Sequence, residues 1–581
     1  MDQRQDTMTL TDRQSFDTLA KRLGDEWDTL RDGSRWIISV GISECSIAKG
    51  AQHTFDHLRM KLEDSGLRYT LRRVGCGGWC WAEPFVTVSG PGMPTVLYAN
   101  VSGDSVPDLV SSMQRGVPFY DLAVGVEGDT PYGDLRPLSE HPFFAIQKRV
   151  LFENCGVIDP ESIEDYIACG GYSSWIKVLH DMSPQDVIEE MKIANVRGRG
   201  GAGFPAGIKW ESARQARAEP KYVAVNSHEG EPNVYKDRRL IESDPHLVLE
   251  GILIACYAVG SHRGYNYVGG EHVMALARFR KAVQDAIDYG LIGDDVLGTG
   301  FDVEVRTRAG GGAYICGEGS ALMYSVMGDR GQPRTKPPRS VEEGLWRRPT
   351  MLNNTESIAN AALVVRNGGD WFAAMGTEKS KGTKLITMQG PLKRLGVVEV
   401  EMGANLKDLI FNVFGGMKDG HEFKGVQTGG VSAGPLTEDQ LDIPVDFDSL
   451  TPLGGMLGSG GFVIFDQTVC AVEFARYLTA FNRYESCSKC TPCRLGNPAL
   501  VEIVDRLRFG SGRSTDIMLI EQASKHVIEL SLCGLGQVAP MPLLGMIQAY
   551  RDEFEAHING SCPTGACPMH ERAGMAIAAG A

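Results

Sequence analysis

Residues 485–496 read ESCSKCTPCRLG, and no other stretch of the chain is as informative. It spaces Cys487, Cys490 and Cys493 three positions apart, and Cys533 follows in the segment SLCGLGQ. Three thiolates at this spacing can hold one corner of a cubane, and a remote fourth cysteine can complete the ligand set of a [4Fe–4S] cluster. The alternatives are a zinc site or reduced structural thiols, but tetrahedral zinc prefers cysteine pairs and this spacing is crowded for it. The motif therefore predicts an iron–sulfur cluster.

The segments on either side of this motif have helical patterns. They read CAVEFARYLTAFNRY (470–484), PALVEIVDRLRF (498–509) and IMLIEQASKHVIELS (517–531). In each of them, apolar residues recur at the spacing of one helix face. We therefore expect the cysteines to lie on a bundle of helices.

A second motif is the glycine-rich stretch RGRGGAGFPAGIKW at 197–210. The preceding segment, SPQDVIEEMKIANV, has a helical pattern, whereas a standard dinucleotide-binding loop follows a strand. Glycines still let backbone N–H groups approach a phosphate or a flat ring closely, and Arg199 and Lys209 add positive charge. The alternative is a flexible surface loop.

Three later loops carry residues that suit the same purpose. They read VNSHEGEPNVYKDRRL (225–240), AGGGAYICGEGSALMYSVMGDRGQPRTKPPRS (309–340) and LNNTES (352–357). Paired acids such as Glu229 and Glu231 bind ribose hydroxyls, while Asn353, Asn354 and Thr355 can donate to phosphate. Together these loops predict one nucleotide pocket.

Composition narrows the class of protein. The 581 residues carry a formal charge of −15, which argues against nucleic acid as a partner because phosphate binding needs a basic surface. We find no secretory signal at the N-terminus and no apolar run long enough to span a membrane, so we expect a cytoplasmic protein. Two counts are unusual. The chain has 70 glycines, and much of the excess over an ordinary glycine content falls in loops at 198–207, 310–319 and 454–461. In the cytoplasm, the 14 cysteines point to metal binding or redox chemistry rather than to disulfides.

Four motifs in this order resemble one family. RGRGGAGFPAGIKW, the HEGEP block, GAYICGEGSAL with TKPP, and ESCSKCTPCRLG are similar to motifs in the flavoprotein subunit of respiratory complex I. Relatives of that subunit serve NAD-dependent formate dehydrogenases, NAD(P)-reducing and electron-bifurcating hydrogenases, and a benzoyl-CoA reductase complex. The resemblance covers about residues 140–570 and implies a multidomain α/β plus α protein. Its FMN would accept a hydride from a nicotinamide and pass electrons singly to the cluster, and no catalytic residue beyond FMN is implied.

The resemblance also implies a domain organisation. We expect an N-terminal helix (1–35), a thioredoxin-like ferredoxin domain (36–105), a connector (106–180), a Rossmann-like FMN/NAD-binding core (181–382), a ubiquitin-like SLBB-type insertion (383–450), a helical bundle with the [4Fe–4S] cluster (451–557) and a cysteine-containing tail (558–581).

Individual residues carry over from the family motifs. The FMN site would use Gly198, Arg199, Gly200, Gly201, Lys209, Asn226, His228, Glu229, Tyr314, Gly317, Glu318, Asn353, Asn354 and Thr355. The nicotinamide nucleotide would contact Phe204, Glu231, Lys336 and Arg339. The cluster would be held by Cys487, Cys490, Cys493 and Cys533.

Three positions depart from the family pattern. His228 and Gly319 stand where acids are usual, and Arg339 stands where Phe is usual. Loss of negative charge near the flavin should raise its potential and ease formation of the anionic reduced form. Arg339 could stack on adenine, or it could bind the 2′-phosphate of NADP. The alternatives are therefore NAD(H), NADP(H) or no nicotinamide at all, besides neutral drift at the rim of the pocket.

The remaining cysteines suggest two further sites. VGCGGWCWAEP contains Cys76 and Cys80 and resembles the second cysteine pair of a [2Fe–2S] ferredoxin domain, but Cys45 has no earlier partner because GIS (41–43) stands there. A site one cysteine short favours a domain that serves as a docking surface, although a cluster with an unusual ligand stays an alternative. In HINGSCPTGACPMH, the residues His557, Cys562 and Cys567 could bind zinc with Cys470, and His570 lies nearby. This pattern resembles a zinc site of hydrogenase-type relatives; reduced surface thiols are the alternative.

The expected function is that of an NAD(P)H dehydrogenase (diaphorase-type) subunit in a larger soluble complex. Partners would be a thioredoxin-fold [2Fe–2S] subunit and a larger iron–sulfur or catalytic subunit, such as a formate dehydrogenase, a hydrogenase or an acyl-CoA-type reductase. Alternatives are an electron-bifurcating variant and a relay or scaffold subunit that no longer binds a nicotinamide. A zinc-only structural protein would not need the 485–496 motif.

Overall fold

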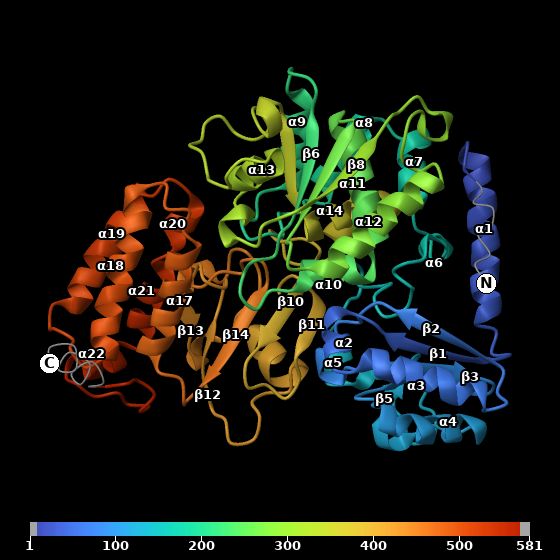
Figure 1. Cartoon of the computed structure of the whole chain (residues 1–581), viewed down its shortest axis with the longest axis horizontal. Helices are drawn as coiled ribbons and strands as arrows, with labels where there is room; N and C mark the ends of the chain where they lie inside the picture. Colours follow the sequence, from blue (N-terminus) through green and yellow to red (C-terminus); the bar gives the residue numbers. More distant parts are fainter. Residues whose placement is uncertain (1–8, 570–581) are drawn as a thin grey trace, which may run out of the picture.

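The computed structural model describes residues 9–569 and divides this part of the chain into four units (Figure 1). An α/β unit lies near the N-terminus, a parallel-sheet core and a second, mixed sheet occupy the middle, and a helical bundle lies at the opposite end. His570 and the rest of the predicted tail (558–581) from residue 570 onward lie outside the described residues. None of the helices in the described range is long and apolar enough to cross a bilayer.

The N-terminal unit is a five-stranded sheet in the order β2-β1-β3-β4-β5. Its strands are β1 (Trp36–Gly41), β2 (Tyr69–Val74), β3 (Val86–Gly90), β4 (Met93–Tyr98) and β5 (Ala123–Val126), and its helices are α2 (Glu44–Ala48), α3 (Ala51–Glu63) and α4 (Val106–Gln114). β1 and β2 are parallel, and the other pairs are antiparallel. The unit extends beyond the predicted boundary at residue 105, because Leu109 and Val126 pack into its core and β5 pairs with β4. Part of the predicted connector is therefore sheet.

Helix α1 (Arg13–Leu30) precedes the N-terminal unit in the chain, but its residues Phe16, Leu19 and Leu23 pack on the hydrophobic core of the parallel-sheet unit. After it, the chain crosses to the core through α5 (Pro142–Ala145), α6 (Ile163–Ala168) and α7 (Ser173–Asp181).

The core is a four-stranded, fully parallel sheet in the order β8-β7-β6-β9. The strands are β6 (Tyr222–Ser227), β7 (Arg263–Val268), β8 (Glu304–Ala309) and β9 (Thr350–Asn354). The helices are α8 (Pro184–Ile193), α9 (Ala206–Gln215), α10 (Lys236–Ser243), α11 (Pro245–Val259), α12 (Val273–Asp288), α13 (Gly319–Met327), α14 (Thr355–Asn367) and α15 (Gly369–Ala373). Helix α11 is buried along almost its whole length. This explains why its segment GILIACYAVG (251–260) is apolar on every face. As predicted, a helix (α8) precedes the glycine-rich loop.

The strand order sets the position of the site. From β6 the chain passes outward to β7 and β8 on one side, and it then returns to place β9 on the other side of β6, so the strand order switches between β6 and β9. Open parallel sheets bind ligands in the crevice beyond the carboxyl ends of strands at such a switch point. Asn226 and Asn354 are register partners at these strand ends.

The second sheet has the order β11-β10-β14-β12-β13. Its strands are β10 (Thr383–Gln389), β11 (Gly396–Glu401), β12 (Phe423–Gln427), β13 (Pro435–Leu436) and β14 (Gly461–Asp466), and α16 (Leu406–Asp408) continues as one π-helical turn to Val413. β14 lies after the boundary predicted at residue 450, but it pairs with both β10 and β12. The strand-rich insertion therefore closes only at Asp466.

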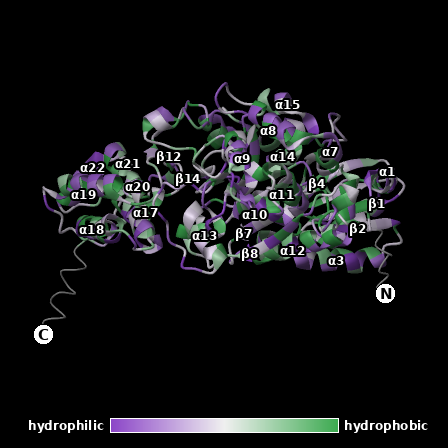
Figure 2. Cartoon of the chain, turned by 90° about the horizontal axis from the view of Figure 1, so that it is seen from above, coloured by the Kyte–Doolittle hydropathy of each residue, from purple (hydrophilic) through white to green (hydrophobic). Residues whose placement is uncertain are grey.

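The helical bundle comprises α17 (Ala471–Glu485), α18 (Thr491–Arg508), α19 (Asp516–Leu530), α20 (Gly534–Val538), α21 (Met541–Ala549) and α22 (Arg551–Ile558). Its helices carry both hydrophilic and hydrophobic residues (Figure 2), because each buries one face in a shared core that includes Leu478, Val504 and Phe554. The long helices α17, α18 and α19 correspond to the three segments predicted from the sequence.

Candidate functional site

A cavity of about 410 Å³ opens at the carboxyl ends of β6 and β9. Three units supply its wall. The core contributes Gly200, Gly201, Ala202, Asn226, His228, Glu229, Gly230, Glu231, Asp237, Tyr314, Ile315, Gly317, Glu318 and Asn354; the second sheet contributes Gly429, Ser432, Met456, Gly458 and Ser459; the bundle contributes Gly534, Leu535 and Val538. The loops predicted to form one nucleotide pocket therefore do converge.

Glycine backbone forms one side of this cavity. Gly201 has φ +116°, a conformation that side-chain-bearing residues rarely adopt, and a Cβ there would lie 3.5 Å from the backbone carbon of Gly458. A Cβ at Gly200 would approach Asn354 Cβ to 3.1 Å. Side chains at these positions would narrow the cavity, so the glycines are a spatial requirement.

The acids of the HEGEP block are fixed by backbone donors. The Glu229 carboxylate accepts hydrogen bonds of 2.9 Å from the N–H groups of Asp237 and Arg238 at the start of α10. Burial raises the pKa of Glu229 to about 7. The Glu231 carboxylate accepts from the Tyr314 hydroxyl and from the Val431 N–H, both at 2.7 Å. Glu231 thus links the core to the second sheet across the cavity.

A buried ionic network lies under the strand ends. The Glu356 carboxylate, which is fully buried, accepts from Lys384 Nζ at 2.6 Å and lies 3.0 Å from Lys236 Nζ. Burial would raise the pKa of Glu356, but the two ammonium groups outweigh that effect and hold it below its usual value. Lys236 also pairs with Asp237 at 2.6 Å, and Asp237 accepts from Asn354 Nδ2 at 2.6 Å. The network therefore reaches the cavity wall through Asp237 and Asn354.

Several predicted site residues support the cavity from behind and do not line it. The Arg199 guanidinium is buried and donates to the carbonyl oxygens of Arg197 and Lys381. Lys209 Nζ donates to the Leu352 carbonyl at 2.8 Å. Gly198, Asn353 and Thr355 are likewise absent from the wall. The two cations of the glycine-rich loop therefore fix backbone segments in this structure.

The four residues predicted to contact the nicotinamide differ in position. Glu231 lines the cavity, whereas Phe204 is 48% exposed and off the wall. Lys336 Nζ pairs with Glu318 at 3.0 Å at the rim, and Arg339 is exposed. Glu318 in turn caps α13 by accepting from the N–H groups of Ser320 and Ala321.

The wall residues of the second sheet and the bundle were mostly missed by sequence reasoning. Only the glycine run at 454–461 gave a signal, and Gly458 does lie on the wall. Ser432, Leu535 and Val538 carried no pattern, because tertiary packing alone brings them to the site.

The cavity suits a flavin nucleotide. Its wall is glycine-rich, as close approach to a flat ring requires, and it has buried polar atoms without a partner in the described part of the chain. These include both ring nitrogens of His228. The residues present therefore fit FMN.

A second, smaller cavity is lined by all four predicted cluster ligands, Cys487, Cys490, Cys493 and Cys533. Cys490 is the N-cap of α18, whose N-terminal dipole favours the negative charge of thiolates and of a bound cluster. Asn497 Nδ2 donates to Cys493 Sγ at 3.3 Å. Four converging thiols with amide and helix-end donors fit a [4Fe–4S] cluster.

The two cavities share a wall. Ile315 and Leu535 line both the flavin-sized cavity and the four-cysteine cavity. Only one layer of apolar side chains therefore separates them.

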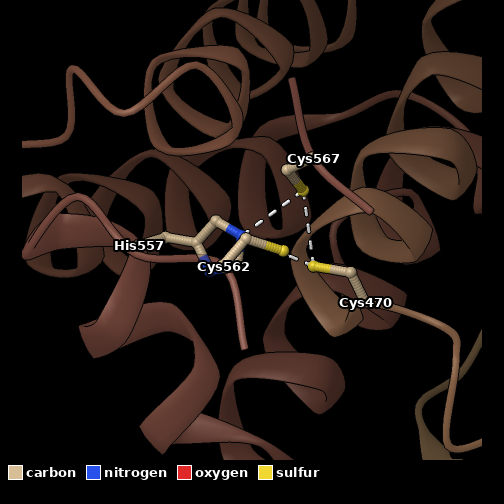
Figure 3. A group of neighbouring side chains, drawn as sticks. All are labelled: Cys470, His557, Cys562 and Cys567. Atoms are coloured by element: carbon tan, nitrogen blue, oxygen red, sulfur yellow. Dashed lines mark hydrogen bonds between the residues drawn. The ribbon is translucent and has the colours of Figure 1, made fainter. Parts of the chain in front are cut away.

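Four further ligand-type residues converge between the start of α17 and the end of the bundle (Figure 3). The His557 Nε2 atom lies 3.5 Å from Cys470 Sγ and 3.3 Å from Cys567 Sγ, and the two sulfurs are 3.5 Å apart. With Cys562, the four ligand atoms all lie within 4.8 Å of one another. His557 Nδ1 lies 2.6 Å from the Glu553 carbonyl, an outer contact that orients a metal-binding imidazole. Ligands about 2.0–2.3 Å from one tetrahedral ion would stand about 3.3–3.8 Å apart, so the set fits zinc.

Cys45 in α2, and Cys76 and Cys80 in the segment that follows β2, lie near α10. Arg239 of α10 is buried, donates to Ser43 Oγ at 3.0 Å and reaches Cys80 Sγ at 3.9 Å. All three thiols are close enough to Arg239 to interact with it electrostatically. A guanidinium therefore lies beside the residues that stand in place of the missing cysteine.

Known protein families match the two regions that carry these cavities. A family model described as the Nuo51 FMN-binding domain matches residues 191–363. A second, described as the NADH-ubiquinone oxidoreductase-F iron–sulfur binding region, matches residues 473–557, which contain the four cysteines of the smaller cavity.

Two curated proteins are similar to most of the chain. The HndC subunit of the NADP-reducing hydrogenase of Solidesulfovibrio fructosivorans is 44% identical over 422 residues, which cover 72% of this chain and 86% of that protein. The F 2 subunit of the NADH-quinone oxidoreductase of Rhizobium meliloti is 40% identical over 421 residues, covering 72% of this chain and 99% of that protein. A crystal structure of an NAD+-reducing [NiFe]-hydrogenase in the H2-reduced state has a similar fold over 97% of this chain and 95% of its own, with a TM-score of 0.64 and 22% identity.

Proposed function

The chain belongs to the family that includes the F-type subunits of NADH-quinone oxidoreductase and the related subunit of NADP-reducing hydrogenase, and from this premise we propose how it works. It is an FMN- and [4Fe–4S]-containing NAD(P)H dehydrogenase subunit of a larger oxidoreductase complex. When bound, FMN supplies the conversion between a hydride and single electrons. The observation that carries the proposal is the wall that the flavin-sized cavity shares with the four-cysteine cavity.

The residues of the chain position the two centres and exclude water between them. Gly200 and Gly201 let backbone approach the flavin nucleotide, and the Asn226 and Asn354 amides face it from the strand ends. Ile315 and Leu535 keep the path to the cluster short and dry. Helix α18 directs its N-terminus at the cluster ligands and stabilises their charge.

The nicotinamide enters at the side of the cavity where Glu231 lies. Glu231 is held by Tyr314 and Val431, so its oxygens are oriented before a ribose arrives. Lys336 pairs with the wall residue Glu318, and Arg339 is exposed three positions further along the chain; their charge suits the phosphates of the nucleotide. NAD(H) is our first choice, NADP(H) the alternative favoured by Arg339, and a relay subunit without nicotinamide the second alternative.

We propose zinc for Cys470, His557, Cys562 and Cys567. This assignment is supported by the convergence of four ligand atoms on one point and by the Glu553 carbonyl behind the histidine. A structural ion there would tie the end of α22 to the start of α17 and so hold the bundle that carries the cluster.

For the N-terminal unit we propose a thioredoxin-like docking domain without a [2Fe–2S] cluster. The support is Arg239, whose guanidinium lies among three thiols at a site one cysteine short. Iron analysis distinguishes an N-terminal domain without a cluster from one with a [2Fe–2S] cluster. The [4Fe–4S] cluster alone gives about four iron atoms per chain, and both clusters together give about six. About six would overturn this proposal.

The segment 383–466 is proposed to be the ubiquitin-like insertion, supported by its mixed five-stranded sheet around α16. Cytoplasmic location, a thioredoxin-fold [2Fe–2S] partner and a catalytic subunit such as a hydrogenase, formate dehydrogenase or acyl-CoA-type reductase are further proposals. A bifurcating variant would need electron exits on those partners.

The test of the function uses purified protein with FMN bound, mixed anaerobically with NADH or with NADPH. We expect flavin absorbance to bleach with at least one nucleotide, and the preferred one identifies the cosubstrate. Bound FMN that neither nucleotide bleaches would instead indicate the relay subunit.

A further inference from the structure

His228 is a buried titratable side chain on the wall of the flavin-sized cavity. It is 8% exposed, and neither ring nitrogen has a partner in hydrogen-bond geometry among the described residues, although the Ala313 carbonyl lies near enough to act on the imidazole. Its ring lies edge-on to Tyr267, with centroids 6.0 Å apart. Buried polar groups in native proteins are nearly always hydrogen-bonded, so an imidazole of this kind on a cavity wall points to a partner on the bound molecule.

Charged and polar groups surround His228 on every side. They are Glu229 and Glu231 on its own loop, Tyr267 in β7, Glu271 and His272 before α12, the Ala313 carbonyl and Tyr314 near α13, and Glu485 at the end of α17. Glu229 and Glu231 are occupied by the hydrogen bonds described above. Glu271 is different, because its side chain is 42% exposed and lies 3.8 Å from His272. It links the neighbourhood of His228 to solvent.

We propose that His228 takes up a proton at a ring nitrogen when FMN in this cavity is reduced, and releases it when the electrons leave. The inference rests on the proposed function. The nicotinamide gives up a hydride, which carries two electrons and one proton, and becomes the oxidised nucleotide. The flavin gains one negative charge. A second proton comes from water and is held on His228, so the site takes up two electrons and two protons in all.

Electrostatics supports this exchange. Without the added charge, burial holds the pKa of His228 below its usual value, against the opposing effect of Glu271. The imidazole is then neutral near pH 7. An opposite charge within about 4–6 Å shifts a pKa by about 1–3. The negative charge of a reduced flavin in the same cavity would therefore raise the pKa of His228 and favour its protonated form. A positive imidazolium in turn stabilises the reduced ring, a role that an acid at this position could not perform.

Coupled proton uptake can be read from the flavin potential. For a two-electron couple, a tenfold change in proton concentration shifts the potential by about 30 mV per proton taken up. One proton gives a slope of about 30 mV per pH unit, and two give about 60 mV. The slope of the flavin potential against pH therefore reports whether a second proton is taken up on reduction, and it needs no turnover assay.

The experiment is a spectroelectrochemical titration of bound FMN in the full-length holoprotein between about pH 7 and pH 8.5, where histidines with raised pKa values titrate. It compares the wild-type protein with His228→Asn, His228→Gln and the control His180→Asn, which changes an exposed histidine on α7. We expect a slope near 60 mV per pH unit in part of this range for the wild-type protein and the control. For both His228 variants we expect about 30 mV.

A wild-type slope of about 30 mV throughout the range overturns the inference, even if a variant fails to fold or to bind FMN. Slopes that are equal in the wild-type protein and the His228 variants overturn it as well. The proposed function fails in a distinguishable way, because the purified wild-type protein would then contain no FMN or would hold FMN that neither NADH nor NADPH bleaches, whereas the slope is measured electrochemically without a nucleotide.

Discussion

Glu356→Gln should destabilise the protein strongly, because it removes a carboxylate that two buried lysines share. Glu356 is fully buried and accepts from Lys384 Nζ at 2.6 Å and from the Leu385 N–H at 3.0 Å, and it lies 3.0 Å from Lys236 Nζ. Removing one partner of a buried ion pair costs about 3–5 kcal/mol. Lys236 keeps Asp237, whereas Lys384 would keep only the Leu385 carbonyl. We therefore expect a loss of about 3 kcal/mol at neutral pH, the lower end of that range, because Lys384 can shed its proton.

The pH dependence gives a sharper test. Burial already lowers the pKa of Lys384 to about 7, and loss of Glu356 lowers it further. A lysine whose pKa is lower when folded destabilises the folded state increasingly as pH falls toward that folded pKa. Below about pH 7, Lys384 is already protonated in the folded wild-type protein, so the free-energy penalty of burying it stops growing. In the variant its folded pKa is lower, so the penalty continues to grow as the pH falls. The difference in free energy of unfolding between the wild-type protein and Glu356→Gln should therefore widen by up to about 1.4 kcal/mol for each pH unit below about 7. The lowered pKa of Glu356 keeps its own contribution intact until the solution is more acidic.

The assay is denaturant unfolding of the wild-type protein, Glu356→Gln and the double variant Glu356→Gln/Lys384→Met at pH 6 and pH 8. Replacing both partners of a buried pair by uncharged groups is far less costly than removing one. The double variant should therefore recover most of the loss and show little of the extra pH dependence. A loss in Glu356→Gln below about 1 kcal/mol, or a double variant as unstable as the single one, would refute the reasoning.

Three further changes test the cofactor sites. Gly201→Val should weaken FMN binding at least tenfold by fluorescence titration, because φ is +116° and the side chain would meet Gly458; unchanged affinity would contradict the assigned cradle. Cys533→Ser should lose the iron–sulfur absorbance and keep FMN, and full iron content would remove Cys533 from the ligand set. Cys562→Ser should lose about one zinc per chain by elemental analysis and lower the melting temperature, whereas wild-type protein free of zinc would refute that site.

Local spacing predicted which four cysteines line one cavity and which glycines line one side of the flavin-sized cavity. The intervals between Cys487, Cys490 and Cys493 follow from cluster geometry, so the sequence alone predicted a shared cavity for them and Cys533, and the structure has one. The helix before the glycine-rich loop was likewise readable from its periodicity.

Features set by distant packing were not readable. Cations beside glycines predict phosphate contacts for Arg199 and Lys209, and no sequence pattern indicated that both also donate to backbone carbonyls of distant segments. Ser432 and Leu535 reach the cavity from other units, and β14 joins a sheet whose other strands precede it by a long loop. No short-range pattern encodes such contacts.

The most direct test of the central account follows both centres in one sample. The purified holoprotein is titrated anaerobically with the preferred nicotinamide nucleotide, while absorbance reports the flavin and electron paramagnetic resonance reports the cluster. The account predicts that flavin bleaching is accompanied by the spectrum of a reduced [4Fe–4S] cluster, and that Cys533→Ser bleaches without that spectrum. A flavin that bleaches fully while the wild-type cluster stays oxidised under excess nucleotide would contradict transfer across the wall of Ile315 and Leu535.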